Sequence, residues 1–198
     1  MILHKADILR ALVRPAAASS DFDLNPEFAR RVAPVRDAGV LVPLIERSSG
    51  VHLVLTKRAA HLAAHPGQIA FPGGKRDAQD VDITATALRE AYEETGLSPE
   101  LVRVLGHLPS HETVTGFKVT PTIGWISGPW QVKADPGEVE EVFEVPLRHV
   151  LHLANFHVQK RIWNGQNRAY YTVPYGPYYI WGATARILRG FAEQMRAP

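Results

Sequence analysis

The stretch that decides the fold of this chain begins with FPGG at residues 71–74 and ends with REAYEETGL at residues 89–97. Residues 84–95 have the periodicity of a helix, and Gly96 is a suitable left-handed residue to end it. The glycine pair lets the backbone turn and approach a ligand closely, because it carries no Cβ. The segment therefore predicts a turn through glycine into a helix.

Three carboxylates share one face of the predicted helix. At about 100° per residue, Glu90, Glu93 and Glu94 lie within an arc of roughly 100°, because they are spaced at i+3 and i+4. The opposite face is mostly small, so we expect it to pack on a sheet and the acidic face to point away from that sheet. This expected packing face contains Thr84, Ala85, Leu88, Ala91, Tyr92 and Thr95.

The crowded carboxylates call for a neutralising charge. Like charges at this spacing cost about 0.2–0.5 kcal/mol per pair in water, and more where solvent is reduced. A hard divalent cation suits them because Mg²⁺ prefers oxygen ligands. The carboxylates alone fit a solvated acidic surface as well, but the adjacent glycines favour a metal site. Either Asp80 or Asp82 could cap the helix, and for both we expect a structural rather than a catalytic role.

Composition excludes several classes of protein. The chain has 198 residues, no cysteine and a formal net charge of +2, so disulfides and thiolate metal sites are excluded and no nucleic-acid partner is indicated. The longest apolar stretch, residues 38–45, is too short to span a membrane. Because residues 1–18 do not resemble a secretory signal, we expect a cytoplasmic protein.

Patterning predicts a single α/β (α+β) domain over residues 1–198, with a short N-terminal helical extension over about residues 1–36 and a mixed sheet. Residues 39–46 and 51–57 form an expected hairpin. Further strands are expected at 101–108, 118–126, 154–163 and 168–173, and helices at 8–13, 84–95 and 182–195.

The segment from Gly74 to Leu97 resembles the Nudix box, in which a glycine, five residues, a glutamate and seven residues precede REUXEEXGU. The chain matches the glycine and the whole second half, with Ala91 at the aliphatic position. It departs where Asp80 replaces the glutamate and where eight residues precede Arg89. The resemblance to Nudix hydrolases implies a mixed β-sheet sandwiched between helices, a divalent metal, and hydrolysis of a diphosphate linked to another moiety.

The aspartate at position 80 and the loop that is one residue longer resemble the pattern of the coenzyme A diphosphatase subgroup. Residues 55–74 also resemble the second motif of that subgroup, although Ala63 occupies its second basic position, where His61 or His65 could substitute. Residues 142–147 and 180–188 resemble the subgroup weakly. The subgroup implies a small-molecule substrate, CoA or acyl-CoA, cleaved to 3′,5′-ADP and (acyl-)4′-phosphopantetheine. Another nucleotide diphosphate, such as ADP-ribose or NADH, and a non-catalytic nucleotide-binding domain stay as alternatives.

The resemblance also implies roles for single residues. It places Mg²⁺ or Mn²⁺ on Glu90 and Glu94, with Glu93 bound directly or through water and the backbone carbonyl of Gly74 contributing. Arg89 orients a glutamate, or else forms a surface ion pair. The general base is expected from an acidic run placed before a strand, with Glu138 or Glu141 as candidates; a solvated charge run is the competing interpretation. That run contains Glu138, Glu140, Glu141 and Glu144.

Substrate binding is expected from the motif before the helix. Lys57 and Arg58 attract phosphates, or are surface charges at a strand edge, and Gly67 and Gly73 let the backbone approach the substrate. A homodimer is possible. An aromatic cluster near the C-terminus could stack on an adenine or line an interface, but because strand aromatics are usually buried we expect it in the core and not in the site. It consists of Tyr170, Tyr171, Tyr175, Tyr178, Tyr179 and Trp181.

Overall fold

A computed structural model describes residues 3–27, 35–163 and 165–197 and shows a large mixed sheet between helices. The main path of the sheet runs β1-β7-β8-β2-β3-β4; in addition β5 pairs with β2, β6 with β8 and β9 with β3. The expected α+β class is confirmed. These strands are β1 (Ser19–Ser20), β2 (Arg36–Arg47), β3 (Gly50–Arg58), β4 (Ile69–Ala70), β5 (Gly73–Lys75), β6 (Val102–His107), β7 (His111–Glu112), β8 (Phe117–Ile126) and β9 (Val139–Pro146).

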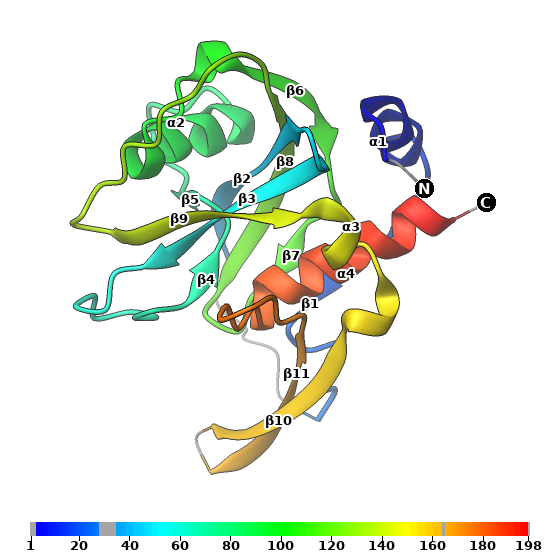
Figure 1. The fold of residues 1–198 in the computed structure, drawn as a ribbon. Coiled ribbons are helices and arrows are strands. Elements are labelled where there is room, and N and C mark those ends of the chain that lie inside the picture. The colour runs from blue at the N-terminus through cyan, green and yellow to red at the C-terminus, as the bar shows by residue number, and fades with distance from the viewer. Residues whose placement is uncertain (1–2, 28–34, 164, 198) are drawn as a thin grey trace.

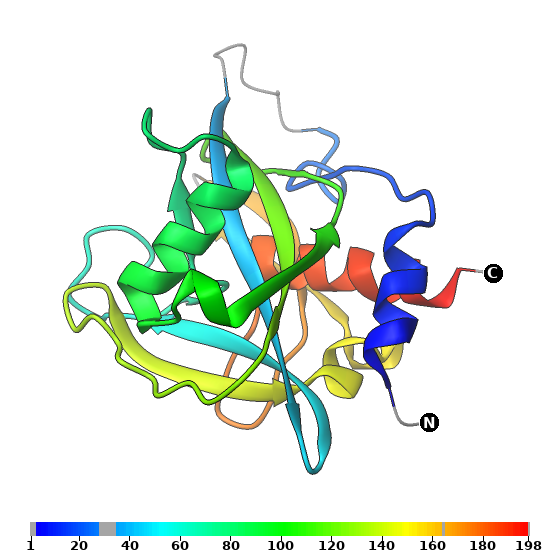
Figure 2. The same ribbon diagram turned by 90° about the horizontal axis from the view of Figure 1, so that it is seen from above.

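The helices cover opposite faces of this sheet (Figures 1 and 2). Side chains alternate along β2, so Leu41 and Ile45 pack toward α2, whereas Val42 and Leu44 belong to the core beneath α4. The larger core lies on the α4 side, where Phe191 and Ile8 are fully buried. The helices are α1 (Lys5–Leu12), α2 (Ile83–Thr95), α3 (Leu147–Val150) and α4 (Gly182–Arg196).

The sequence-predicted hairpin and helices are present. In the hairpin, β2 and β3 are antiparallel with Leu44 opposite Leu53. Helix α2 lies close to β2 because Gly39 has no side chain: a Cβ there would be 2.6 Å from the carbonyl oxygen of Ile83. In the part of the chain that the structure describes, no helix is long and apolar enough to cross a bilayer.

The predicted orientation of α2 is only partly right. Ala91 and Thr95 of the expected packing face are buried, but Glu94 is buried as well and Tyr92 is 55% exposed. The acidic face does not point away from the sheet, because β5 pairs with β2 beside the helix and covers the face that carries Glu90. Two glycines in β5 make this contact possible, since a Cβ at Gly74 would be 2.5 Å from Glu90 Oε2.

Three other elements differ from the prediction. The strand expected at 154–163 begins only at residue 157, because Leu153–Asn155 forms a 3-10 turn. β10 (His157–Trp163) and β11 (Gln166–Thr172) then form a separate hairpin that projects from the body of the protein (Figure 1). Three residues of the acidic run, Glu140, Glu141 and Glu144, lie within β9 rather than before a strand.

The N-terminal extension is only partly helical. Beyond α1, Ser19 and Ser20 form β1, which pairs in parallel with His111 and Glu112 of β7. Part of the extension predicted over about 1–36, residues 1–2 and 28–34, lies outside the described residues.

Candidate active site

Arg89 organises the polar face of α2. Its Nε donates to Asp80 Oδ1 and its second terminal nitrogen to Asp80 Oδ2, both at 2.9 Å. The first terminal nitrogen donates to Glu90 Oε1 at 3.0 Å and to Glu93 Oε2 at 2.9 Å. The guanidinium therefore links the loop before the helix to two of its glutamates, which is more than a surface ion pair.

Asp80 is the anchor of this network. It is buried, and its Oδ2 also accepts from the backbone N–H of Asp77 and the hydroxyl of Thr86, each at 2.9 Å. The hydrogen bond from Arg89 holds the pKa of Asp80 well below its usual range. The helix cap is Asp82 instead, whose Oδ1 accepts from the backbone N–H of Ala85 at 2.8 Å. Asp80 thus positions Arg89, and Asp82 has the cap role.

Glu94 is buried and incompletely paired. Only 4% of the residue is exposed, and its Oε2 has no hydrogen-bond partner. Burial raises the pKa of Glu94 to about 8, with the charges of Glu90 and Glu138 adding to the increase. The charge of Arg58 and the backbone N–H of Gly73 act in the opposite direction. Glu90, Glu94 and Glu138 are therefore near enough for their charges to act on one another.

Glu90 shares this environment, whereas Glu93 does not. Burial raises the pKa of Glu90, with Glu93 and Glu138 contributing, although Arg89 lowers it. The side chain of Glu93 is 55% exposed. The three glutamates on α2 are therefore not equivalent, and the inner pair is Glu90 and Glu94.

The inner pair fits a hard cation. Among the described residues, three or more His, Asp or Glu side chains do not meet as a ready metal-binding group. Glu90 and Glu94 nevertheless offer oxygen ligands, and Glu94 Oε2 is buried without a partner. Both pKa values are raised by burial and by neighbouring negative charge, and a bound cation would offset both effects.

The two candidate bases occupy different surroundings. Glu138 acts electrostatically on Glu90 and Glu94, so it lies on the α2 side. Glu141 accepts a hydrogen bond from the hydroxyl of Tyr178 at 2.5 Å. The ring of Tyr178 stacks on Phe143 in the α4-side core, two residues along β9 from Glu141 and hence on the same face. Glu138, but not Glu141, thus contributes to the raised pKa values of the carboxylate pair.

The two candidate phosphate-binding cations are also separated. Lys57 pairs with Glu140 across the β3–β9 ladder, with Nζ 2.6 Å from Oε1. Arg58 acts electrostatically on Glu94, and its buried Nε has no hydrogen-bond partner. The backbone N–H of Gly67 donates to the carbonyl of Arg58 at 3.1 Å, which closes the loop after β3. Of the two cations, Arg58 is the one whose charge acts on Glu94 of the inner pair.

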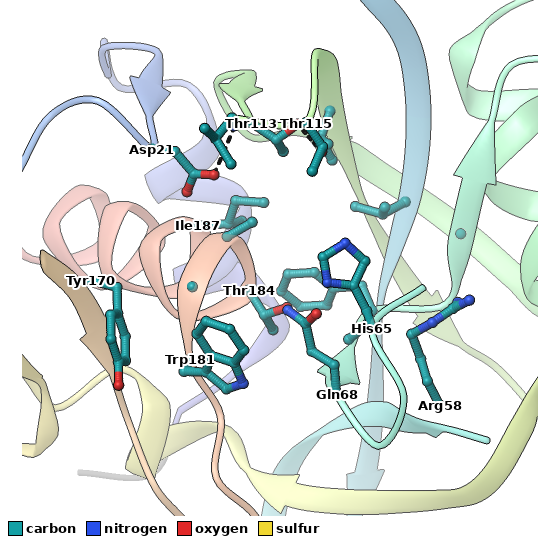
Figure 3. Close-up of a pocket in the computed structure, with 18 of the residues that line it drawn as sticks. Asp21, Arg58, His65, Gln68, Thr113, Thr115, Tyr170, Trp181, Thr184 and Ile187 are labelled. Carbon is teal, nitrogen blue, oxygen red and sulfur yellow. Dashed lines mark hydrogen bonds between the residues drawn. The ribbon is translucent and has the colours of Figure 1, made fainter. Parts of the chain in front are cut away.

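A cavity of about 260 Å³ adjoins the carboxylates and shares Arg58 and Gly73 with them (Figure 3). Its wall includes His65, whereas Nε2 of His61 lies 3.2 Å from the carbonyl of Gly137. Tyr170 and Trp181, expected in the core, also line it, and Tyr179 is 46% exposed, so the core prediction is wrong for these three. Other lining residues that sequence reasoning missed include Asp21, Gln68, Thr113, Thr115, Arg161, Arg168, Thr184 and Ile187.

The missed residues come from segments far apart in the chain. They lie before β2, between β3 and β4, between β7 and β8, on the β10–β11 hairpin and at the start of α4. No local motif joins these segments. The one sequence signal was the motif of residues 55–74, which contains His65 and Gln68.

Comparison with known proteins shows the family. The NUDIX domain model matches residues 35–168. A protein of Enterobacter sp. named "Uncharacterized Nudix hydrolase NudL" is 43% identical over 175 residues, which cover 87% of this chain and 89% of that protein. A protein of the same name from Salmonella dublin is 42% identical over 174 residues, 87% of this chain and 89% of that one. The chain belongs to the Nudix family, and the expected enzyme class, a Nudix hydrolase, is confirmed.

Solved structures show the same fold. The MutT protein of Methanosarcina mazei superposes with a TM-score of 0.52 at 20% identity, over 85% of this chain and 100% of that one. The Nudix hydrolase RenU of M. smegmatis gives 0.51 at 23% identity, over 62% of this chain and 77% of that one. The Nudix-type sheet sandwiched between helices is therefore confirmed.

Proposed function

We propose that this chain hydrolyses the diphosphate of CoA or acyl-CoA to 3′,5′-ADP and (acyl-)4′-phosphopantetheine. The observation that carries the chemistry is the buried, unpartnered Glu94 Oε2, whose carboxyl group is under the charges of Glu90 and Glu138 and next to Gly73 of the cavity wall. The substrate class is supported by residues 55–74, which resemble the CoA-type motif and supply much of the cavity wall. Those wall residues are Arg58, His65, Gln68, Ala70, Phe71 and Gly73.

Mg²⁺ or Mn²⁺ is held in this proposal by Glu90 and Glu94, with Glu93 as an outer ligand and the Gly74 carbonyl contributing. When bound, such an ion neutralises phosphate charge and makes a water molecule more acidic. Arg89 keeps Glu90 oriented through its bidentate bond to Asp80.

The residues of this chain then divide the remaining work. Arg58 offsets the negative charge of the diphosphate, and Lys57 adds a more distant positive charge. The backbone at Gly67 and Gly73 shapes the entrance to the cavity. Water attacks one phosphorus atom while the bond from that phosphorus to the bridging oxygen breaks. Glu138 takes the proton of the attacking water, and Glu141, held by Tyr178, is the weaker candidate base.

The alternatives depend on Ala63, which lacks the cation expected at that motif position. An enzyme that hydrolyses ADP-ribose or NADH would need the same carboxylates. A domain that only binds a nucleotide would not need them. The cytoplasmic location and the homodimer stay predictions.

The test is an assay of the purified chain with CoA, ADP-ribose and NADH in Mg²⁺ or Mn²⁺, with products identified by mass. We expect 3′,5′-ADP and 4′-phosphopantetheine from CoA, and no products with a chelator. Much faster cleavage of ADP-ribose would overturn the CoA assignment. Tight nucleotide binding without any turnover would overturn the enzymatic proposal.

A further inference from the structure

The cavity beside Gly73 has an excess of positive charge. Arg58, Arg161 and Arg168 line it, and Asp21 is the single carboxylate among the described residues of its wall. Asp21 is already engaged: it pairs with Arg168 at 2.8 Å and accepts from the backbone N–H of Val114 at 2.9 Å. The remaining positive charge is on Arg58, next to the reacting carboxylates, and on Arg161, on the hairpin.

Arg161 makes ring contacts instead of ion pairs. Its guanidinium lies 4.2 Å from the ring centroid of Trp181 and 5.9 Å from that of Tyr170. Within the described parts of the chain it has no carboxylate partner. A guanidinium that stacks through its face keeps its N–H donors at the edge, where they can bind a phosphate through two hydrogen bonds.

The rest of the cavity suits a flat, apolar ring. Its wall includes the aromatic residues Trp181 and Tyr170, whose centroids are 5.2 Å apart, and the buried apolar residues Phe71 and Ile187. Gln68 and Thr184 project toward the same space (Figure 3) and add neutral polar groups. Aromatic faces and a few polar groups are the usual means of holding a nucleobase.

The hairpin that carries Arg161 is tied to the body of the protein. Asn25 donates to the carbonyl of Ala169 at 2.9 Å and accepts from its N–H at 2.7 Å. The neighbouring Arg168 pairs with Asp21. These contacts hold the strand that faces Arg161, because Ala169 pairs with Lys160 and Arg168 pairs with Arg161 in the β10–β11 ladder.

We propose that this cavity binds the nucleoside half of the substrate, and that Arg161 binds a phosphate carried by its sugar in addition to the diphosphate. The inference rests on the proposed function and deepens it, because it names which half of CoA enters the cavity. The pantetheine half is uncharged beyond its shared phosphate and offers Arg161 no counterpart. Arg161 then determines the preference for a sugar-phosphorylated nucleotide.

A binding measurement tests the role of Arg161 without the need for any substrate turnover. Titration calorimetry measures the affinity of the chain for 3′,5′-ADP and for 5′-AMP, which lacks the second phosphate. We expect 3′,5′-ADP to bind about 10–100-fold more tightly, the range of a charge-assisted hydrogen-bonded contact. Arg161→Gln should reduce this preference to within about threefold, and Arg161→Lys should restore part of it.

Lys160→Gln is the matched control. It removes the same charge from the neighbouring position of β10, where Lys160 is exposed and does not line the cavity. It should leave the preference unchanged. An equal loss in both variants would overturn the assignment, because it would reflect the general charge of the hairpin. The assignment would also be wrong if the wild type bound both nucleotides with equal affinity. It would be wrong as well if CoA displaced neither nucleotide although 4′-phosphopantetheine binds to the chain.

The activity of the same variants separates this inference from the proposed function. Arg161→Gln should lower kcat/KM for CoA and leave that for dephospho-CoA nearly unchanged. If CoA is hydrolysed but Arg161→Gln changes the rates for CoA and dephospho-CoA equally, the proposed role of Arg161 is wrong and the proposed function is supported. If 3′,5′-ADP binding depends on Arg161 but CoA is not hydrolysed, the proposed function is wrong and the assignment of the cavity to the nucleoside half is supported.

Discussion

The carboxylate face of α2 and the cavity beneath the β10–β11 hairpin meet at Gly73 but are built in opposite ways. The α2 face comes from one short stretch, from Gly74 to Glu94, and is held by a network of charges centred on Arg89. The cavity gathers residues from six separate parts of the chain and is lined mostly by rings, apolar groups and cations.

This difference separates two properties of the enzyme. Changes on α2 should affect the chemical step for every diphosphate, because each substrate presents the same diphosphate to it. Changes in the cavity should affect KM and the choice of substrate, because only the organic part of the substrate reaches it.

The largest effect is expected from Glu94→Gln. Loss of its negative charge should lower kcat about 10²–10³-fold for all diphosphate substrates, as for the removal of a group that stabilises transition-state charge. The fold should persist, because glutamine has nearly the same shape. Glu93→Gln is the matched control, and its exposed side chain predicts a much smaller loss. Steady-state rates check both; similar losses in the two variants would contradict the inner-pair assignment.

Glu94 should also make stability depend on pH in metal-free protein. Its pKa is about 8 when folded, above the ordinary 4.5, so the folded state holds the proton more tightly than the unfolded state. The stabilising contribution is therefore complete below about pH 4.5 and is lost as pH rises to about 8, on the order of a few kcal/mol in total. Urea denaturation with a chelator should show this loss in the wild type and not in Glu94→Gln.

The candidate bases give a paired test on one segment. Glu138→Gln should lower kcat about 100-fold, the lower range for removal of a general base. Glu141→Gln should change kcat little, because Glu141 faces Tyr178 on the other side of β9. Rates measured across pH would show loss of one limb of the profile only in the Glu138 variant. The reverse pattern would assign the base to Glu141.

Asp80→Asn should weaken the clamp on Arg89. We expect a 10–100-fold lower kcat, typical for loss of a residue that orients a ligand, and a loss of about 1–3 kcal/mol in unfolding free energy. Asp82→Asn serves as the control, because asparagine caps a helix as well as aspartate does. Activity and chemical denaturation check both variants. Equal behaviour of the two would show that the bidentate bond has no role in orientation.

The smallest effect belongs to the cavity. Gln68→Ala should raise KM for CoA about fivefold with little change in kcat, since it removes about one net hydrogen bond from substrate binding. Full kinetic curves distinguish the two parameters. A fall in kcat with an unchanged KM would contradict the proposed division between the regions.

Much of the fold was predictable because its signals are local. The hairpin of β2 and β3 and the helices α2 and α4 follow from alternation and helical periodicity over short windows. The boundaries of β10 and the inclusion of the acidic run in β9 were missed. A 3-10 turn before one strand and the pairing of the other with β3 depend on contacts outside those windows.

The site shows the same limit. The sequence placed Arg89, Glu90 and Glu94 together on α2. It did not predict that Glu94 is buried, because that burial depends on the pairing of β5 beside the helix. It offered Glu138 and Glu141 as equals, and only the tertiary contacts distinguish them: Glu141 accepts from Tyr178, whereas the charge of Glu138 acts on Glu94. It expected Trp181 in the core, where large aromatic residues are usually found.

By itself, the sequence determined the family, the helix that carries the carboxylates and the glycine turn that brings backbone close to them. These features arise from spacing along one continuous segment, where covalent geometry sets which side chains share a face. The tertiary structure decided which glutamates are buried, which candidate base reaches them and what lines the neighbouring cavity. Burial and long-range pairing follow from packing between distant segments, and no short stretch of sequence contains that information.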